Sequence, residues 1–244
     1  VISHNRTHRR YGDGGGAVLI GAARLQRARV THNRATLSGG GVWCSDGVVA
    51  DCEIAHNRAG IAGGGINAPR AALVRDSSVH DNRAGRQGGG INAGASTRIA
   101  ACSINGNRAR EAGGIHMYSA TVSECTIASN TAQRGGGVFS NNGSITNCLV
   151  LANTAKEGGG LWCEYLAAPR LLTVSGNRAR TGGGLYASRN VKIDACVFTH
   201  NDAREGAGVA CASGAELTSC VIMSNTAARG GGGVWCAPAS DEYP

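Results

Sequence analysis

The fold of this 244-residue chain is decided by residues 125–148, which read CTIASNTAQRGGGVFSNNGSITNC. This stretch holds Asn130, a glycine triplet that starts five residues later, and apolar residues at Ile127, Val138 and Ile145. The same order of residues recurs from one end of the chain to the other. A fixed period of this length indicates a solenoid of stacked repeats.

One asparagine per repeat measures the period. The first step between successive asparagines is 28 residues and every later step is 23 to 25 residues, which gives ten repeats of roughly 24 residues. In nearly every repeat a glycine cluster follows five or six residues after the asparagine. The asparagines are Asn5, Asn33, Asn57, Asn82, Asn107, Asn130, Asn153, Asn177, Asn201 and Asn225.

Three columns of apolar residues appear when the repeats are aligned on these asparagines. The columns lie three residues before the asparagine, eight residues before it, and directly after the glycines; Pro169 interrupts the second. Three consecutive glycines would each cost about 1 kcal/mol in a helix, which excludes a helical solenoid. We therefore predict an all-β fold, a parallel β-helix of about ten coils with three short strands per coil and a length on the order of 45 Å. Asparagine and glycine are then expected at turns, with stacked asparagine amides forming a hydrogen-bonded ladder.

Two short motifs resemble the Gly-Gly-Ala-Ile and Phe-x-x-Asn repeats of the polymorphic outer-membrane proteins, within the wider pectin-lyase-like superfamily of right-handed β-helix proteins. They are Gly15-Gly16-Ala17-Val18 and Phe198-Thr199-His200-Asn201. The resemblance covers almost the whole chain. It implies a right-handed β-helix and an extracellular or bacterial cell-surface location, and it implies no catalytic residue.

Composition and patterning predict one β-helix domain over residues 1–244, because no linker interrupts the repeats. We expect it to be a mature portion or a piece of a longer protein. No run of eighteen apolar residues occurs, so the sequence predicts no transmembrane segment. The terminal coils are expected to expose strand edges, which makes head-to-tail self-association a candidate property.

The ten cysteines fall in two columns that share the interior with the apolar residues. Buried cysteine acts as a small hydrophobic residue, so we expect free thiols. Disulfides between neighbouring coils and a metal site are the alternatives, although a straight column of thiols cannot surround zinc tetrahedrally.

An outward column after the glycines is rich in aromatic side chains. Aromatic rows bind sugar rings by stacking, so this column is a candidate ligand-contact strip. The alternative is that the rings stack on one another and stabilise the sheet. The candidate residues are Trp43, His116, Phe139, Trp162, Tyr186 and Trp235.

A second outward column follows the asparagines and is basic in five successive coils. Like charges one coil apart repel unless they are solvated or share an anion. With a net charge of +8, this row predicts an anionic partner such as an acidic polysaccharide or surface glycan, with a solvated basic edge as the alternative. Nucleic acid is disfavoured because no aromatic residues interleave with the row. The row comprises Arg6, Arg34, Arg58, Arg83 and Arg108.

The sequence offers no recognisable catalytic constellation. The sixteen acidic residues are spread over the turns, and His4, His32 and His56 form a turn column that we interpret as structural. We expect no catalytic residue, no cofactor and no metal.

Two functions remain open at this point. The first is a non-enzymatic extracellular or cell-surface β-helix with a structural or adhesive role that contacts glycans. The second, motivated by the aromatic strip, is a polysaccharide-processing lyase or hydrolase, or a carbohydrate-binding remnant of one.

Overall fold

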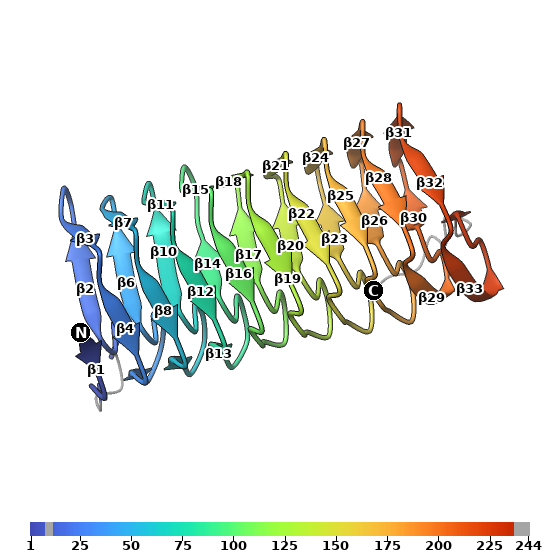
Figure 1. The fold of residues 1–244 in the computed structure, drawn as a ribbon. Helices are drawn as coiled ribbons and strands as arrows, with labels where there is room; N and C mark the ends of the chain where they lie inside the picture. The colour runs from blue at the N-terminus through green and yellow to red at the C-terminus, as the bar shows by residue number, and fades with distance from the viewer. Residues whose placement is uncertain (8–11, 237–244) are drawn as a thin grey trace.

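The computed structural model describes residues 1–7 and 12–236 as a rod of stacked parallel coils (Figure 1). Every regular element among these residues is a β-strand, and strands of successive coils pair in parallel. No helix in the described part of the chain is long and apolar enough to cross a membrane. The predicted all-β architecture of about ten coils, with three strands in nearly every coil, is confirmed.

The pre-Asn sheet contains the strand that leads into each asparagine turn. Its ten strands are β1 (Ile2–Ser3), β4 (Arg29–Thr31), β8 (Glu53–Ala55), β12 (Ser78–His80), β16 (Ser103–Asn105), β19 (Thr126–Ala128), β22 (Leu149–Leu151), β25 (Thr173–Ser175), β28 (Val197–Thr199) and β32 (Val221–Met223).

The post-Gly sheet contains the strand that follows each glycine cluster. Its ten strands are β2 (Ala17–Ile20), β6 (Val42–Ser45), β10 (Ile66–Arg70), β14 (Ile91–Ala93), β17 (Ile115–Tyr118), β20 (Val138–Asn141), β23 (Leu161–Glu164), β26 (Leu185–Arg189), β30 (Val209–Ser213) and β34 (Val234–Cys236).

The third sheet connects the other two along each coil. Its nine strands are β3 (Arg24–Gln26), β7 (Val48–Ala50), β11 (Leu73–Arg75), β15 (Arg98–Ala100), β18 (Thr121–Ser123), β21 (Ser144–Thr146), β24 (Ala168–Arg170), β27 (Lys192–Asp194) and β31 (Glu216–Thr218). Further short strands, which the sequence did not predict, pair beyond the asparagine turn: β5 (Arg34–Ala35), β9 (Arg58–Ala59), β13 (Arg83–Ala84), β29 (Asp202–Glu205) and β33 (Thr226–Gly230).

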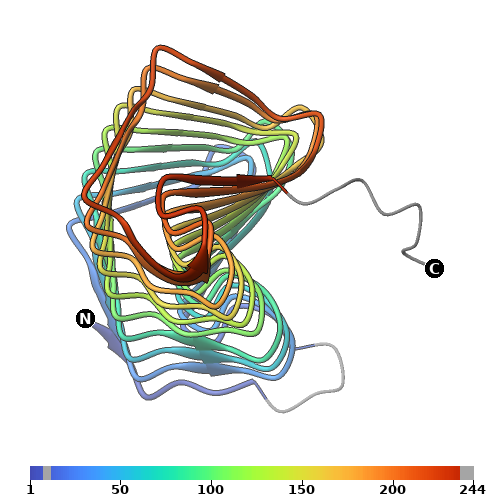
Figure 2. The same cartoon turned by 90° about the vertical axis from the view of Figure 1, so that its right-hand side faces the viewer.

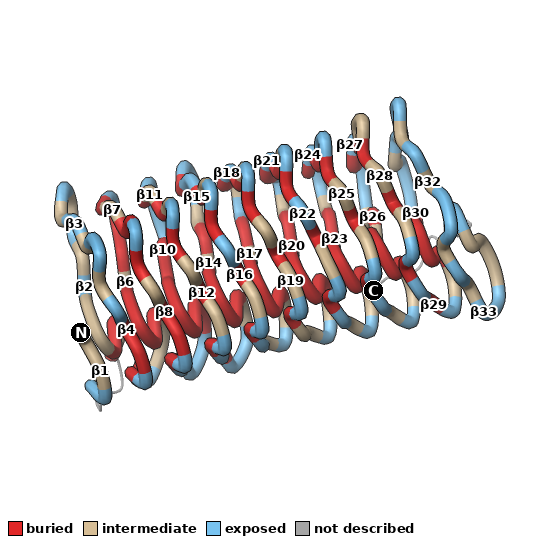
Figure 3. Tube along the Cα trace, viewed as in Figure 1, coloured by how far each residue is buried: buried red, intermediate tan, exposed pale blue. Residues whose placement is uncertain are grey.

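The interior is a narrow apolar core that runs along the rod, and buried positions thin out at its two ends (Figure 3). The three predicted apolar columns supply it, as Ile127, Val138 and Ile145 show in one coil. Pro169 also points inward, paired with Ile145 of the preceding coil. Alternation along each strand therefore separates a buried face from an outward face.

The asparagines form the predicted ladder inside the rod. Asn130 is fully buried; its side-chain Nδ2 donates to Oδ1 of Asn153 at 3.0 Å and to the carbonyl oxygen of Ile104 at 3.0 Å. Its own Oδ1 accepts from the backbone N–H of Asn107 at 2.9 Å. The residue with left-handed backbone in this turn is the one before the asparagine, such as Ser129 at φ 55°. The asparagine itself stabilises the turn through the hydrogen bonds of its side chain.

The glycine clusters let successive coils pass close together. Gly39 has φ 67°, a conformation that favours glycine, and a Cβ at Gly40 would lie 2.3 Å from the carbonyl oxygen of Gly64. A side chain at either position would strain or separate the coils.

All ten cysteines are free thiols, and eight of them are buried. In the column before the pre-Asn strands, Sγ donates to the carbonyl oxygen two residues earlier, as Cys125 does to Ser123 at 3.1 Å. Ser77 occupies the same column and donates to the carbonyl of Arg75 at 2.7 Å. A small hydrogen-bonding side chain is thus what this turn requires.

Candidate functional site: an arginine-lined groove

The predicted arginine row lies on the short strands beyond the asparagine turn. Each of β5, β9 and β13 is an Arg-Ala pair; the alanine points inward and is buried, whereas the arginine points outward and is exposed. Parallel pairing places Arg34 opposite Arg58 and Arg58 opposite Arg83. Isolated bridges extend the register to Arg6 at one end and Arg108 at the other.

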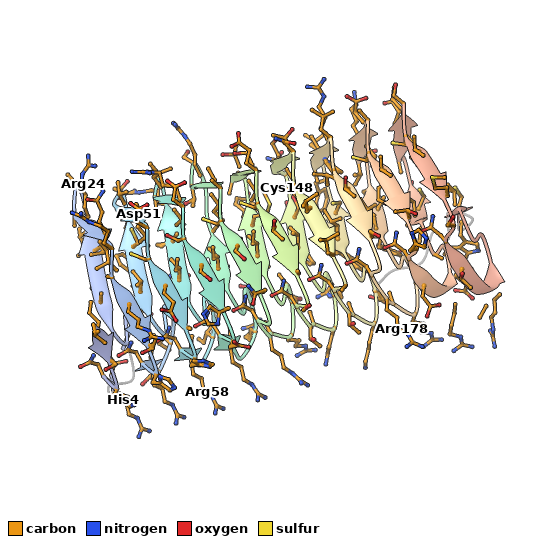
Figure 4. All side chains as sticks on the ribbon, in the orientation of Figure 1. His4, Arg24, Asp51, Arg58, Cys148 and Arg178 are labelled. Carbon is orange, nitrogen blue, oxygen red and sulfur yellow. The ribbon has the colours of Figure 1, made fainter. Side chains whose placement is uncertain are left out.

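The five arginines line one groove with a volume of about 500 Å³. Its remaining lining consists of small residues, including Thr36, Gly60 and Gly85, with Arg110 at one end. In Figure 4, Arg58 lies on the lower edge of the rod, where a series of long side chains projects away from the ribbon. The sequence therefore predicted residues that the fold brings together along one edge.

The guanidinium groups of this row have no protein partner among residues 1–7 and 12–236. None of the five makes a side-chain hydrogen bond or an ion pair there, whereas Arg178, further along the same column, pairs with Asp202 at 3.3 Å. Stacked strands lie about 4.8 Å apart, so like charges are held at short, regular intervals. An array of this kind creates a positive electrostatic potential along the groove.

Sequence reasoning missed a second basic column, three residues after the asparagine. Backbone hydrogen bonds connect its members coil to coil, for example from Lys156 N–H to the Gln133 carbonyl at 2.9 Å and from Arg180 N–H to the Lys156 carbonyl at 2.8 Å. These side chains are exposed and carry the basic edge onward from the end of the arginine row. The column consists of Arg110, Gln133, Lys156, Arg180 and Arg204. Tabulating every position after the asparagine would have revealed it.

The described lining of the groove consists of arginines and small residues. Its described lining contains no carboxylate, histidine or tyrosine. Carboxylates are the usual acid and base in hydrolysis of a glycosidic bond. The charge of this lining is therefore positive along its whole length.

The aromatic column forms a continuous stack, but the expectation of an exposed strip is wrong at its centre. Phe139 and Trp162 are only 6% and 8% exposed. Trp162 stacks on Tyr186 at 4.2 Å between ring centroids and on Phe139 at 6.2 Å, and Phe139 stacks on His116 at 5.1 Å. The rings present their faces to one another, which is the arrangement expected if the strip stabilises the sheet.

The stack is buried because the chain beyond the asparagine turn folds back beneath the post-Gly sheet (Figure 2). Arg134 from that segment lies over the rings of Phe139 and Trp162, at 5.7 and 5.5 Å from their centroids, and forms an ion pair with Glu111. Burial lowers the pKa of the His116 imidazole to about 4; nearby Glu111 opposes this shift and Arg134 adds to it.

The other two candidate aromatics lie away from this stack. Trp43 pairs in register with Val18 and Asn67, and Trp235 pairs with Ala210, so neither continues the row of rings. Both side chains are half-buried. Their contact with a glycan stays a prediction.

The histidine column is a stack, as expected. His4 and His32 have ring centroids 5.2 Å apart, and His32 and His56 lie 5.0 Å apart. At the end of this stack, His80 lies near two carboxylates, those of Glu53 and Asp81.

Comparison with known protein families agrees with this architecture. The family described as the right handed beta helix region matches residues 44–179 and 74–243, which together span most of the chain. The chain therefore belongs to the right-handed β-helix family. No curated protein and no solved structure matches it.

Proposed function

We propose that this β-helix is a non-enzymatic, extracellular or cell-surface rod that binds a linear acidic polysaccharide along its arginine-lined groove. The observation that carries the proposal is the row of five exposed guanidinium groups without a protein partner in the described chain. Charge-assisted hydrogen bonds to carboxylate or sulfate groups would satisfy them.

The shape of the groove favours an extended polymer over a small anion. Its cationic groups are distributed over five successive coils, and Arg110 extends them in the direction of the second basic column. A chain with a negative charge on successive units can contact several coils at once. A single small anion would reach one or two guanidinium groups.

Acidic polysaccharide is preferred to single-stranded nucleic acid because the described lining contains no aromatic ring. Proteins that bind single strands usually stack bases on aromatic side chains, in addition to binding the backbone. The same lining disfavours glycoside hydrolysis, since its described residues include no carboxylate.

The proposal is tested by measuring affinity for polygalacturonate with calorimetry at several salt concentrations. We expect the wild-type chain to bind, with affinity falling as salt rises. The triple substitution Arg34→Gln, Arg58→Gln and Arg83→Gln should weaken binding at least about tenfold, because each charge-assisted hydrogen bond contributes about 1.5–3 kcal/mol.

A charge-matched control substitutes three exposed arginines of other sheets, Arg24→Gln, Arg98→Gln and Arg189→Gln. This control should retain the affinity. Equal losses in the two triple variants, or absence of binding by the wild type, would refute the groove as the site. Shortening of the polymer during the assay would overturn the non-enzymatic role. Tighter binding of single-stranded DNA than of polygalacturonate would mean that the partner is a nucleic acid and not a polysaccharide.

A further inference from the structure

A cluster of metal-ligating side chains lies where the histidine stack ends. The ligand atoms of His56, His80 and Asp81 all lie within 4.8 Å of one another. His56 and Asp81 occupy the same left-handed turn position in successive coils, with φ 56° and 54°. His80 comes from the outward face of β12.

The backbone holds the two coils of this cluster in fixed register. The N–H of His56 donates to the carbonyl oxygen of His80 at 3.3 Å. The rings of His56 and His80 meet edge to face, with centroids 5.8 Å apart and planes at 83°. The edge-to-face arrangement brings ring nitrogens together with the Asp81 carboxylate, unlike the parallel stack of His4 and His32 at 5°.

The surroundings of His80 assign separate roles to its two nitrogens. Nδ1 lies 2.9 Å from Oδ2 of Asp81, and Nε2 lies 3.6 Å from Oε1 of Glu53. Glu53 is itself held by Arg29 at 2.9 Å. The Glu53 carboxylate lies beyond hydrogen-bond distance but attracts an N–H at Nε2 electrostatically, which favours the tautomer whose Nδ1 faces Asp81 and can bind a metal.

We infer that His56, His80 and Asp81 form a binding site for a divalent transition metal of the zinc type. Two imidazoles and one carboxylate are ligands that Zn²⁺ accepts, and water completes a tetrahedral set. Zinc–ligand bonds of about 2.0–2.2 Å place the ligand atoms roughly 3.3 Å apart, which small side-chain rotations achieve from the present positions. Glu53 acts as the positioning residue behind His80.

The test is a calorimetric titration of the full chain with Zn²⁺, in a Cys220→Ser, Cys236→Ser background. These two cysteines are the incompletely buried ones and would compete for zinc. Serine suits the Cys220 position because Ser77 fills the same column in another coil. We expect one ion per chain, and weaker binding in acid, because protons compete with Zn²⁺ for the imidazole nitrogens.

Substitutions distinguish this site from surface histidines in general. His56→Asn should weaken Zn²⁺ binding at least about tenfold, and Glu53→Gln about tenfold, because it releases His80. His200→Asn is the matched control, since His200 occupies the same turn position with φ 54° and bonds to Thr199. Asparagine tolerates this conformation, so both turn variants should fold.

A readout without substitution at the site comes from the imidazole resonances in nuclear magnetic resonance spectra. Zinc should shift the ring signals of His56 and His80 and leave those of His200 in place. Equal weakening by His56→Asn and His200→Asn, or shifts spread evenly over all histidines, would overturn the inference, as would failure of zinc to bind. Polysaccharide binding by the arginine groove is measured separately and does not depend on this outcome.

Discussion

His116 shows how a single residue can couple the fold to pH. Its imidazole is the first ring of the aromatic stack, against Phe139 and near Arg134. Burial holds its pKa near 4, below the ordinary value of 6.5. The sequence placed His116 in the correct outward column but could not show this burial, because the covering segment comes from another part of the coil.

The low pKa predicts that stability falls on acidification. Between pH 6.5 and 4 the unfolded chain binds a proton that the folded His116 does not bind, so the free energy of unfolding decreases as the pH falls. The loss is at most about 3 kcal/mol at pH 4. Urea unfolding followed by circular dichroism at several pH values measures it.

His116→Asn is the control for this prediction, because Asn92 occupies the paired position in the preceding coil. The variant should lose stability less steeply than the wild type over this pH range. Parallel profiles for the two proteins would show that His116 does not titrate as described.

At the scale of elements, the sequence was most informative about the interior. Ile54 and Asn57 belong to columns that are buried in every coil except the first and the last, because each column has a single structural role. The outer face was less predictable. Alternation places Trp162 outside the post-Gly sheet, but its burial depends on the segment that carries Arg134, whose path no local pattern specifies.

The aromatic stack is therefore predicted to stabilise the post-Gly sheet. Trp162→Ala should lower the free energy of unfolding by about 3 kcal/mol or more, since it removes a buried ring stacked on both sides and the Nε1 hydrogen bond to Glu164 at 2.8 Å. Tyr118→Ala is the control; Tyr118 is exposed in the same sheet, and its loss should change stability by less than about 0.5 kcal/mol. Equal losses of unfolding free energy in the two variants would mean that the aromatic stack does not stabilise the sheet.

At the scale of the whole molecule, the residues that maintain the rod and the residues that vary on its surface occupy different columns. Asparagine, glycine and cysteine columns maintain the coil spacing, and the outward columns are free to differ between coils. Arginine at one position in five successive coils gives the N-terminal half a basic groove, and the column of Arg110, Lys156 and Arg180 continues the basic edge. Head-to-tail association of these rods stays a prediction.

The most direct test of the arginine groove is a titration of the ¹⁵N-labelled chain with an oligogalacturonate, observing the arginine Nε–H resonances. Binding along the groove predicts shifts concentrated on Arg34, Arg58 and Arg83, with smaller ones at Arg6 and Arg108, and unchanged signals for Arg24 and Arg98 in the third sheet. Shifts of similar size on all arginines, or shifts confined to the third sheet, would contradict the proposed function.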